Sequence, residues 1–286
     1  MELTNINEIK TLLTRHGFRF SKSKGQNFLT AAWVPEDIAD SAGLDGQTGV
    51  MEVGPGIGCL TEQLSMRAGK VVSVELDTAL KPVLEETLAG RENVEIVYGD
   101  ILKINIPELL DEKMPGMRHV VCANLPYNVT GPVISKLLKC RRFDSVTVMI
   151  QREVARRICA KPGTGEYGEF TVFVNWYAKP EMLFDVPPCC FIPQPKVTSS
   201  VIRLNCREAP PVEVKSEAMF MRVVRAAFAQ RRKTLLNALS ASFGELSKQE
   251  VEKCLLDSGF DPKVRGEVLS IGEFAKIADA FFNVLD

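Results

Sequence analysis

The sequence predicts an α/β domain with a mostly parallel sheet, followed by a small domain made only of helices. Two observations support this fold class. Between about residues 50 and 204, short β-rich runs alternate with helical stretches, as in sheets whose strands are joined by crossover helices. After Pro210–Pro211 the pattern is helical to the end of the chain. We therefore expect one domain over residues 1–207, with a basic segment over 1–30, and a second domain over 208–286.

The expected strands are rich in Val, Ile and other β-forming residues. They are Val50–Val53, Val71–Glu75, Val94–Tyr98, His119–Ala123, Val146–Ile150, Thr171–Tyr177 and Ser200–Leu204. Helices are expected between them near residues 59–67, 78–89, 130–139 and 151–160. Three more are expected in the second domain, over roughly 216–241, 247–257 and 272–284, with turns at Gly244, Gly259 and Gly266.

The composition is that of a globular protein that forms its own core, with 45% hydrophobic and 25% charged residues. The formal net charge of -1 does not by itself indicate a nucleic-acid partner. The eight cysteines contain no C-x-x-C pair, and the two histidines belong to no cluster with metal-ligand spacing, so we expect reduced thiols and no metal. With no secretory segment and no apolar run of membrane-spanning length, we expect a cytoplasmic protein without a membrane, monomeric by default.

A glycine-rich loop follows the first expected strand, where residues 51–58 read M-E-V-G-P-G-I-G. Glycines at this point let the backbone approach a ligand at the carboxyl end of the sheet. A plain tight turn is the simpler interpretation, and a dinucleotide site is a second one. The dinucleotide fingerprint G-x-G-x-x-G would need glycine at Cys59, so the spacing favours a cofactor without a pyrophosphate.

Two acids end the next two expected strands. Glu75 closes the second strand, where a carboxylate can accept hydrogen bonds from ribose hydroxyls. Asp100 closes the third, where it could accept a hydrogen bond from the exocyclic amine of an adenine. Either acid alone could simply cap a helix or face solvent. Together, beside a glycine loop, they predict one nucleoside site, and the pattern resembles the Rossmann-like class I S-adenosylmethionine methyltransferase fold.

The segment Asn124-Leu125-Pro126-Tyr127-Asn128 follows the fourth expected strand and resembles the motif of methyltransferases that act on exocyclic amines of bases. The lone pair of adenine N6 is delocalised into the ring, so that nitrogen is a poor nucleophile. The side-chain oxygen of Asn124 and a backbone carbonyl, that of Leu125, could accept its two N–H groups and localise the lone pair. Tyr127 could stack on the base, which is worth ~1–3 kcal/mol. The alternative is a proline-containing turn on which a tyrosine packs.

Three further segments resemble the ribosomal RNA adenine N6-dimethyltransferase family. They are Gly25–Leu29, Phe191–Val201 and Val224–Leu235, and the likeness runs from about residue 20 to the C-terminus. Within the family the sequence is most similar to bacterial small-subunit enzymes. This resemblance implies N6,N6-dimethylation of two adjacent adenines in the loop of the 3′-terminal helix of 16S RNA, with S-adenosylmethionine as methyl donor, during assembly of the small ribosomal subunit.

The resemblance also implies roles for individual residues. Asn124, Leu125, Pro126, Tyr127 and Phe191 match target-base positions, and Phe191 would sandwich the adenine with Tyr127 unless it packs in the core. The matching cofactor positions are Gln26, Asn27, Leu29, Gly54, Gly56, Glu75, Leu76, Asp100, Ile101 and Asn124. Ser23-Lys24 departs from the family, which more often has an aromatic residue next to Gly25.

Basic residues are segregated along the chain, which predicts RNA contacts. Residues 45–130 are net acidic, whereas residues 133–161 and 222–233 are strongly basic. On a single helix, Arg222, Arg225, Arg232 and Lys233 would share one side. With Arg152 and Arg156, these are the expected RNA-binding residues. The alternative is a solvated basic face.

Three other functions remain as alternatives. A large-subunit adenine methylase of the same family would share the glycine loop and the Asn124–Tyr127 motif, but the helical-domain sequence argues against it. An RNA-binding assembly or transcription factor could keep the fold without catalysis, although Glu75, Asp100 and Asn124 are all intact. A nicotinamide oxidoreductase is disfavoured by the glycine spacing.

Overall fold

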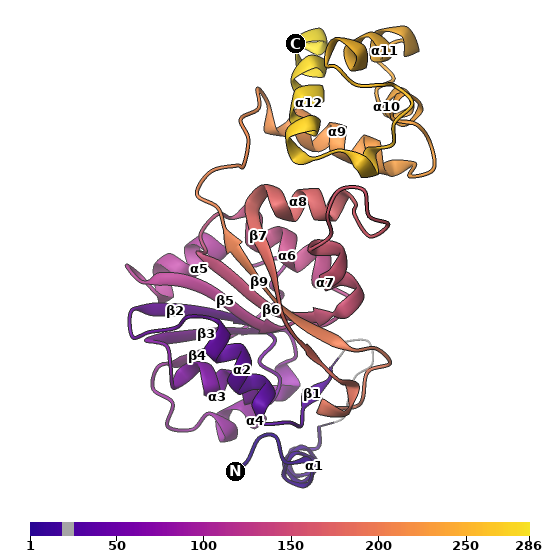
Figure 1. Ribbon diagram of the computed structural model, residues 1–286. Coiled ribbons are helices and arrows are strands. Elements are labelled where there is room, and N and C mark those ends of the chain that lie inside the picture. The colour runs from indigo at the N-terminus through magenta and orange to yellow at the C-terminus, as the bar shows by residue number, and fades with distance from the viewer. Residues whose placement is uncertain (19–25) are drawn as a thin grey trace. The chain divides into compact units, whose positions relative to one another are not determined.

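The computed structural model describes residues 1–18 and 26–286 (Figure 1). Part of the basic segment expected over 1–30 lies outside the described residues, namely Arg19, Lys22 and Lys24, and so do Ser23 and Gly25. The chain forms two compact units, the first from Met1–Ala155 and Lys179–Cys206, the second from Arg156–Ala178 and Arg207–Asp286.

The second unit therefore includes residues 156–178, which the sequence analysis assigned to the domain over 1–207. These residues pack with the C-terminal helices. The hydroxyl of Tyr167 donates to the carbonyl of Leu269 over 2.8 Å. Trp176 stacks on Phe220 with ring centroids 4.2 Å apart. These contacts within the second unit join two stretches that are distant in sequence.

A seven-stranded sheet forms the centre of the first unit, in the order β4-β3-β2-β5-β6-β9-β7. Its strands are β2 (Thr48–Val53), β3 (Lys70–Glu75), β4 (Val94–Tyr98), β5 (Arg118–Asn124), β6 (Ser145–Gln151), β7 (Ala178–Val186) and β9 (Ser199–Cys206). The pairs from β4 to β6 are parallel, and β6 pairs with β9 antiparallel. The mostly parallel seven-stranded sheet is thus confirmed.

One expected strand is wrong. Residues Thr171–Tyr177 lie in helix α8 (Glu169–Tyr177), and the seventh strand is the segment that follows it, β7. The valines and aromatic residues of α8 favour a strand by propensity. In the structure the Thr171 hydroxyl accepts from the backbone N–H of Gly168 over 3.1 Å at the start of α8, and Thr171, Val174 and Tyr177 repeat at helical spacing as buried residues. Tertiary packing therefore overrides local propensity here.

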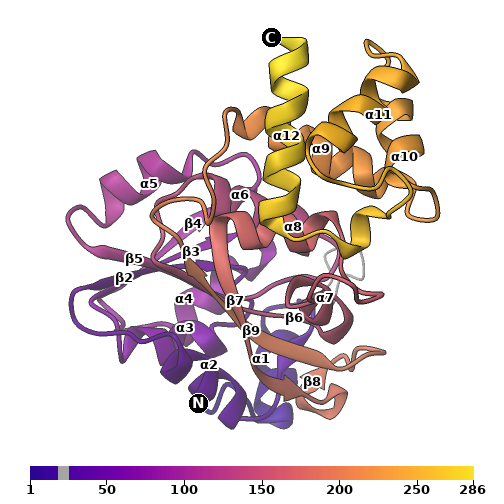
Figure 2. The same cartoon turned by 45° about the horizontal axis from the view of Figure 1, so that its top comes forward.

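Helices cover both faces of the sheet. Helices α2 (Trp33–Ser41) and α3 (Cys59–Ser65) lie on one face, and α5 (Ile106–Lys113) and α6 (Thr130–Lys139) on the other (Figures 1 and 2). The remaining helices of this part are α1 (Ile6–Arg15), η2 (Thr78–Leu80), α4 (Lys81–Thr87) and η3 (Pro188–Cys190). Helix α7 (Arg152–Ile158) contains the boundary between the two units, at Ala155. Helices α1, α2 and α5 were not predicted from the sequence.

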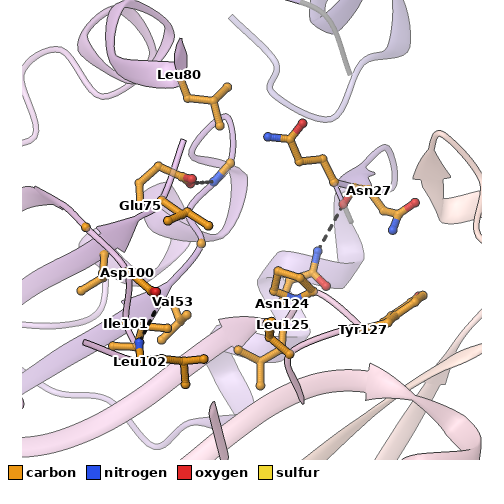
Figure 3. Close-up of a pocket in the computed structure, with 18 of the residues that line it drawn as sticks. Asn27, Val53, Glu75, Leu80, Asp100, Ile101, Leu102, Asn124, Leu125 and Tyr127 are labelled. Atoms are coloured by element: carbon orange, nitrogen blue, oxygen red, sulfur yellow. Dashed lines mark hydrogen bonds between the residues drawn. The ribbon is translucent and has the colours of Figure 1, made fainter. Parts of the chain in front are cut away.

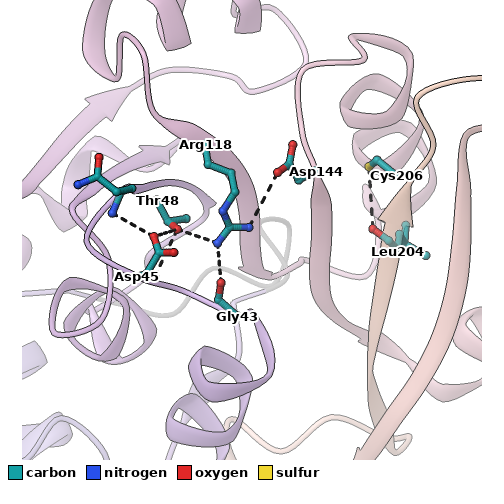
Figure 4. A network of polar contacts seen from close by, with 8 residues as sticks. Gly43, Asp45, Thr48, Arg118, Asp144, Leu204 and Cys206 are labelled. Carbon is teal, nitrogen blue, oxygen red and sulfur yellow. Dashed lines mark hydrogen bonds and ion pairs between the residues drawn. The ribbon is translucent and has the colours of Figure 1, made fainter.

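A polar network stabilises the edge of the sheet at which β2 and β5 begin (Figure 4). Arg118, the first residue of β5, donates to the hydroxyl of Thr48 over 2.7 Å, and that hydroxyl donates to Asp45 over 2.6 Å. Arg118 also lies 4.0 Å from the carboxylate of Asp144. These contacts fix one end of the strands and leave their carboxyl ends for ligand binding.

The second unit is helical, with α8, α9 (Glu217–Ala229), α10 (Leu235–Ser242), α11 (Lys248–Asp257), η4 (Gly266–Val268) and α12 (Ile271–Leu285). Phe220, Phe243, Phe274 and Phe281 form its buried core. The single helix expected over 216–241 is two helices, because the chain turns at 230–234 and Thr234 caps α10 by accepting from the backbone N–H of Asn237. Among residues 1–18 and 26–286, no helix combines the length and apolarity needed to cross a membrane.

Candidate active site

A pocket opens where strands β2 to β5 end, and it encloses about 890 Å³ that no protein atom fills, part of it open to solvent (Figure 3). Its lining contains most of the expected cofactor residues: Gln26, Asn27, Gly54, Gly56, Glu75, Leu76, Asp100, Ile101 and Asn124. Leu125, Pro126 and Tyr127 line it as well. The fold thus brings together residues that are about a hundred positions apart in the sequence.

The glycine loop after β2 has the conformation that only glycine adopts readily. Gly54, Gly56 and Gly58 have φ values of 72°, 61° and 91°. A Cβ atom on Gly56 would lie 3.1 Å from the ring of Phe28. The loop therefore needs glycine both for its backbone conformation and for its close approach to the segment that carries Asn27.

Glu75 ends β3 as a buried carboxylate, and two backbone amides orient it. The N–H of Asp77 donates to its Oε1 over 2.7 Å and that of Gly56 to its Oε2 over 3.3 Å. Burial raises the pKa of Glu75, and these two hydrogen bonds lower it. A carboxylate has about four acceptor positions, so it keeps capacity for ribose hydroxyls. Asp77 in turn accepts from the side chain of Gln26 over 2.9 Å.

Asp100 begins a tight turn after β4. Its Oδ1 accepts from the backbone N–H of Leu102 over 2.9 Å, and its own carbonyl accepts from Lys103 and Ile104. Leu76 and Leu102 line the pocket although their side chains are 60% and 38% exposed. Exposed leucines beside a strand-end acid provide an apolar surface for a flat ring, next to a hydrogen-bond acceptor.

Asn124 and Leu125 present acceptor groups at the end of β5. The Asn124 side-chain nitrogen donates to the backbone carbonyl of Asn27 over 3.3 Å, so the side-chain oxygen has no hydrogen-bond partner among the described residues. The carbonyl of Pro126 is already engaged by Val129 and Thr130. Among the described residues, no backbone N–H donates to the carbonyl of Leu125. The Asn124 oxygen and this carbonyl are therefore the acceptors available for an amine.

Tyr127 lines the same pocket and is held at its hydroxyl. That oxygen lies 2.7 Å from the hydroxyl oxygen of Ser199 on β9. Burial raises the pKa of the phenol. The hydroxyl contact thus fixes the orientation of the ring. This arrangement fits a role for Tyr127 in stacking on a base better than a role as a catalytic acid or base.

Leu29 and Phe191 are the two expected site residues that do not line this pocket. They face each other in a small antiparallel pairing of β1 (Phe28–Leu29) with β8 (Phe191–Ile192). Both side chains are 3% exposed and belong to the hydrophobic core of the first unit. Phe191 therefore packs in the core in this structure, which is the alternative considered from the sequence. Leu29 lines a small cavity that the glycine loop also lines.

Glu52 is a feature that sequence reasoning missed. It is 1% exposed on β2 and lines that small cavity together with Gly54, Gly56 and Asn124. The hydroxyls of Thr61 and Ser73 donate to the same oxygen, Oε2, over 2.7 and 2.6 Å. Burial raises the pKa of Glu52 to about 7. The sequence did contain a signal for this buried acid, because Glu52 stands within an apolar strand, two residues before the glycine loop.

The expected RNA-binding residues fall into two groups. Arg152, Arg222 and Arg225 already pair with Asp185, Glu245 and Glu169, at 3.5, 2.6 and 3.7 Å respectively. Arg222 also lies 4.1 Å from the ring centroid of Phe243.

Arg156, Arg232 and Lys233 form the second group, being exposed and lacking an ion-pair partner among the described residues. Arg232 and Lys233 lie in the turn between α9 and α10, so the prediction that they share one helical face with Arg222 and Arg225 is wrong. The physical reason is that α9 ends at Ala229. Within the described residues, no group of His, Cys, Asp and Glu could hold a metal ion.

A mostly parallel sheet with a pocket at its strand ends is the arrangement of nucleotide-binding α/β proteins. The comparisons place this chain in the class of S-adenosylmethionine-dependent methyltransferases. Solved structures share the fold. The 23S rRNA methyltransferase ErmE has a TM-score of 0.66 and 26% identity, covering 88% of this chain and 98% of that one. A dimethyladenosine transferase from Plasmodium falciparum has a TM-score of 0.71 and 24% identity, with coverages of 87% and 95%.

Sequence comparisons identify the family within this class. The model for the family described as ribosomal RNA adenine dimethylase matches residues 17–281. The protein named ribosomal RNA small subunit methyltransferase A in Shouchella clausii (strain KSM-K16) is 48% identical over 277 residues, covering 96% of this chain and 94% of the relative. Its namesake in Geobacillus sp. (strain WCH70) is 47% identical over 280 residues, covering 96% of each. The chain belongs to the ribosomal RNA adenine dimethylase family, and it is an S-adenosylmethionine-dependent enzyme of that family.

Proposed function

We propose that this enzyme dimethylates N6 of two adjacent adenines in the loop of the 3′-terminal helix of 16S RNA, within the immature small subunit. The observation that carries the proposal is the unengaged side-chain oxygen of Asn124 next to the Leu125 carbonyl, in a pocket bordered by Tyr127. The small-subunit substrate is taken from relatives that are nearly half identical over almost the whole chain. Action as a monomer in the cytoplasm is part of the same proposal.

The residues of the pocket fit S-adenosylmethionine. Glu75 would hold the ribose hydroxyls, Asp100 the exocyclic amine of the cofactor's adenine, and Leu76, Ile101 and Leu102 the faces of its ring. The glycine loop and Asn27 would enclose the methionine end. When bound, the cofactor supplies a methyl group on a sulfonium. The glycine loop has Cys59 where the dinucleotide fingerprint has its third glycine, and this spacing favours a cofactor without a pyrophosphate.

Asn124 and Leu125 would act on the acceptor amine. By accepting its two N–H groups, the Asn124 oxygen and the Leu125 carbonyl would localise the N6 lone pair and fix its direction. Tyr127 would stack on the adenine, which must first leave its own stack in the RNA. No strong base is needed, since the nitrogen becomes acidic once it is methylated. Catalysis would rest on orientation and electrostatic support.

A large-subunit adenine methylase is the second candidate, because the ErmE structure shares the fold over 88% of this chain. The test is transfer of labelled methyl groups from S-adenosylmethionine to unmethylated small subunits, large subunits and free RNA. We expect label on small-subunit particles. Label on large subunits alone would support the second candidate and contradict the proposal.

A further inference from the structure

Lys136 on α6 makes two hydrogen bonds to a single turn. Its Nζ donates to the backbone carbonyl of Leu102 over 2.8 Å and to that of Ile104 over 2.6 Å. The side chain is half-buried, and no carboxylate lies within ion-pair distance among the described residues. Although Lys136 belongs to the basic run that the sequence assigns to RNA binding, its ammonium group points at protein carbonyls.

The turn held by Lys136 is the one that begins at Asp100. Asp100, Ile101 and Leu102 line the pocket, and the turn is closed by the Asp100 carbonyl, which accepts from Lys103 and Ile104 over 2.8 and 3.1 Å. The carbonyls of Leu102 and Ile104 are the ones that reach Lys136. Hydrogen bonds from a charged donor contribute more than neutral ones, and a lost partner leaves these carbonyls to solvent.

Lys136 also connects this turn to the candidate base-binding segment. Helix α6 begins three residues after Tyr127, and its first residue, Thr130, donates through its hydroxyl to the carbonyl of Pro126 over 3.2 Å. The same short helix therefore contacts the Asn124–Tyr127 segment at its start and the Asp100 turn near its end. One rigid element spans the two halves of the site.

We propose that Lys136 is a positioning residue that holds the Asp100–Ile104 turn in the form that binds the adenine of the cofactor. The inference rests on the proposed cofactor role of Asp100. In this account the charge of Lys136 serves the architecture of the pocket, not a phosphate of the RNA. Lys139, one turn further along α6 and exposed, provides a matched comparison within the same basic run.

The experiment measures binding of S-adenosylhomocysteine by calorimetry in the full-length protein, together with amide hydrogen exchange at residues 102–104. Lys136→Met should weaken binding by about tenfold and speed exchange in the turn, because two charge-assisted hydrogen bonds are lost. Lys136→Arg keeps N–H donors and should retain most of the affinity. Lys139→Met should leave both readouts at the level of the unaltered protein.

Two results would overturn the proposal. One is a folded Lys136→Met protein with unchanged affinity and unchanged exchange. The other is a Lys136→Met protein that binds S-adenosylhomocysteine normally but has a weaker, flatter salt dependence of RNA binding, which would make Lys136 a phosphate contact. If Lys136→Met does not fold, the Lys136→Arg variant is the test. An affinity of Lys136→Arg for S-adenosylhomocysteine as low as that of Asp100→Ala would contradict the proposal. Because no RNA is needed for cofactor binding, failure of the 16S substrate leaves this test intact.

Discussion

Asn124 combines two duties in one side chain. Its nitrogen donates to the carbonyl of Asn27, which is a cofactor-side contact, and its oxygen remains available to an incoming amine. The amide orientation is therefore fixed from the protein side before any ligand arrives. An aspartate could not donate to the Asn27 carbonyl, and an alanine would remove both contacts.

We expect Asn124→Ala to lower kcat by about 100-fold or more, the usual scale for loss of a preorganised polar group. The affinity for S-adenosylhomocysteine should fall by less than about tenfold, since Glu75 and Asp100 are unchanged. Single-turnover kinetics and calorimetry measure the two effects. Equal losses of rate and affinity would make Asn124 a cofactor residue only.

Glu52 makes stability depend on pH. Its pKa in the folded protein is about 7, above the ordinary value of 4.5, because burial disfavours the charged form. The folded state therefore holds a proton that the unfolded state releases, and this stability is lost as pH rises from about 4.5 through 7. The groups facing it are the hydroxyls of Thr61 and Ser73 and the carboxyl of Glu75, together with the buried thiols of Cys59 and Cys122.

The corresponding prediction concerns Glu52→Gln. The unaltered protein should lose up to about 3 kcal/mol relative to this variant between pH 5 and pH 8, at ~1.36 kcal/mol per unit of pKa difference. Urea unfolding at a series of pH values measures it. Parallel pH profiles for the two proteins would mean that Glu52 is ionised throughout.

At the scale of elements, single residues at helix starts stabilise the C-terminal helices. Ser270 accepts from the backbone N–H of Glu273 over 3.3 Å, and the Glu273 carboxylate accepts from the Ser270 backbone over 2.7 Å, forming a capping box at α12. Ser270→Ala should cost about 1 kcal/mol of unfolding free energy. Ser242→Ala, an exposed serine at the end of α10, is the control and should have little effect. Equal stability of the two variants in chemical denaturation would contradict the prediction.

The errors of sequence interpretation also lie at this scale. The first five strands of the sheet follow from short, nearly continuous runs rich in Val and Ile, because a parallel sheet is covered by helices on both faces. Thr171–Tyr177 has the same composition but becomes a helix, since Trp176 stacks on Phe220, forty-odd residues away. Such long-range contacts leave no local pattern.

The candidate site was predictable to a greater extent than its surroundings. Gly54, Glu75, Asp100 and Asn124 each lie at or just after the end of a strand, and strand ends of a parallel sheet meet at one edge. The position of Phe191 was harder to predict from the sequence. Its burial depends on the pairing of β8 with β1, and each of these strands has only two residues. Arg232 and Lys233 were misplaced because the stop of α9 at Ala229 carries no glycine or proline signal.

At the scale of the whole molecule, RNA affinity should depend on the exposed basic residues that lack protein partners. Arg232→Glu combined with Lys233→Glu should weaken RNA binding and reduce the slope of log affinity against log salt by about two. Cofactor affinity should not change. Arg222→Glu is a useful comparison, since Arg222 already pairs with Glu245. An unchanged salt slope in the double variant would contradict an RNA contact at this turn.

The central claim is that the pocket converts adenine to N6,N6-dimethyladenosine on the small ribosomal subunit. Nucleoside analysis by mass spectrometry tests it most directly, after incubation of unmethylated small subunits with the enzyme and labelled S-adenosylmethionine. The account predicts that the label accumulates as N6,N6-dimethyladenosine, and that Asn124→Ala abolishes it. Label confined to another nucleoside, or no dimethyladenosine on small-subunit particles, would contradict it.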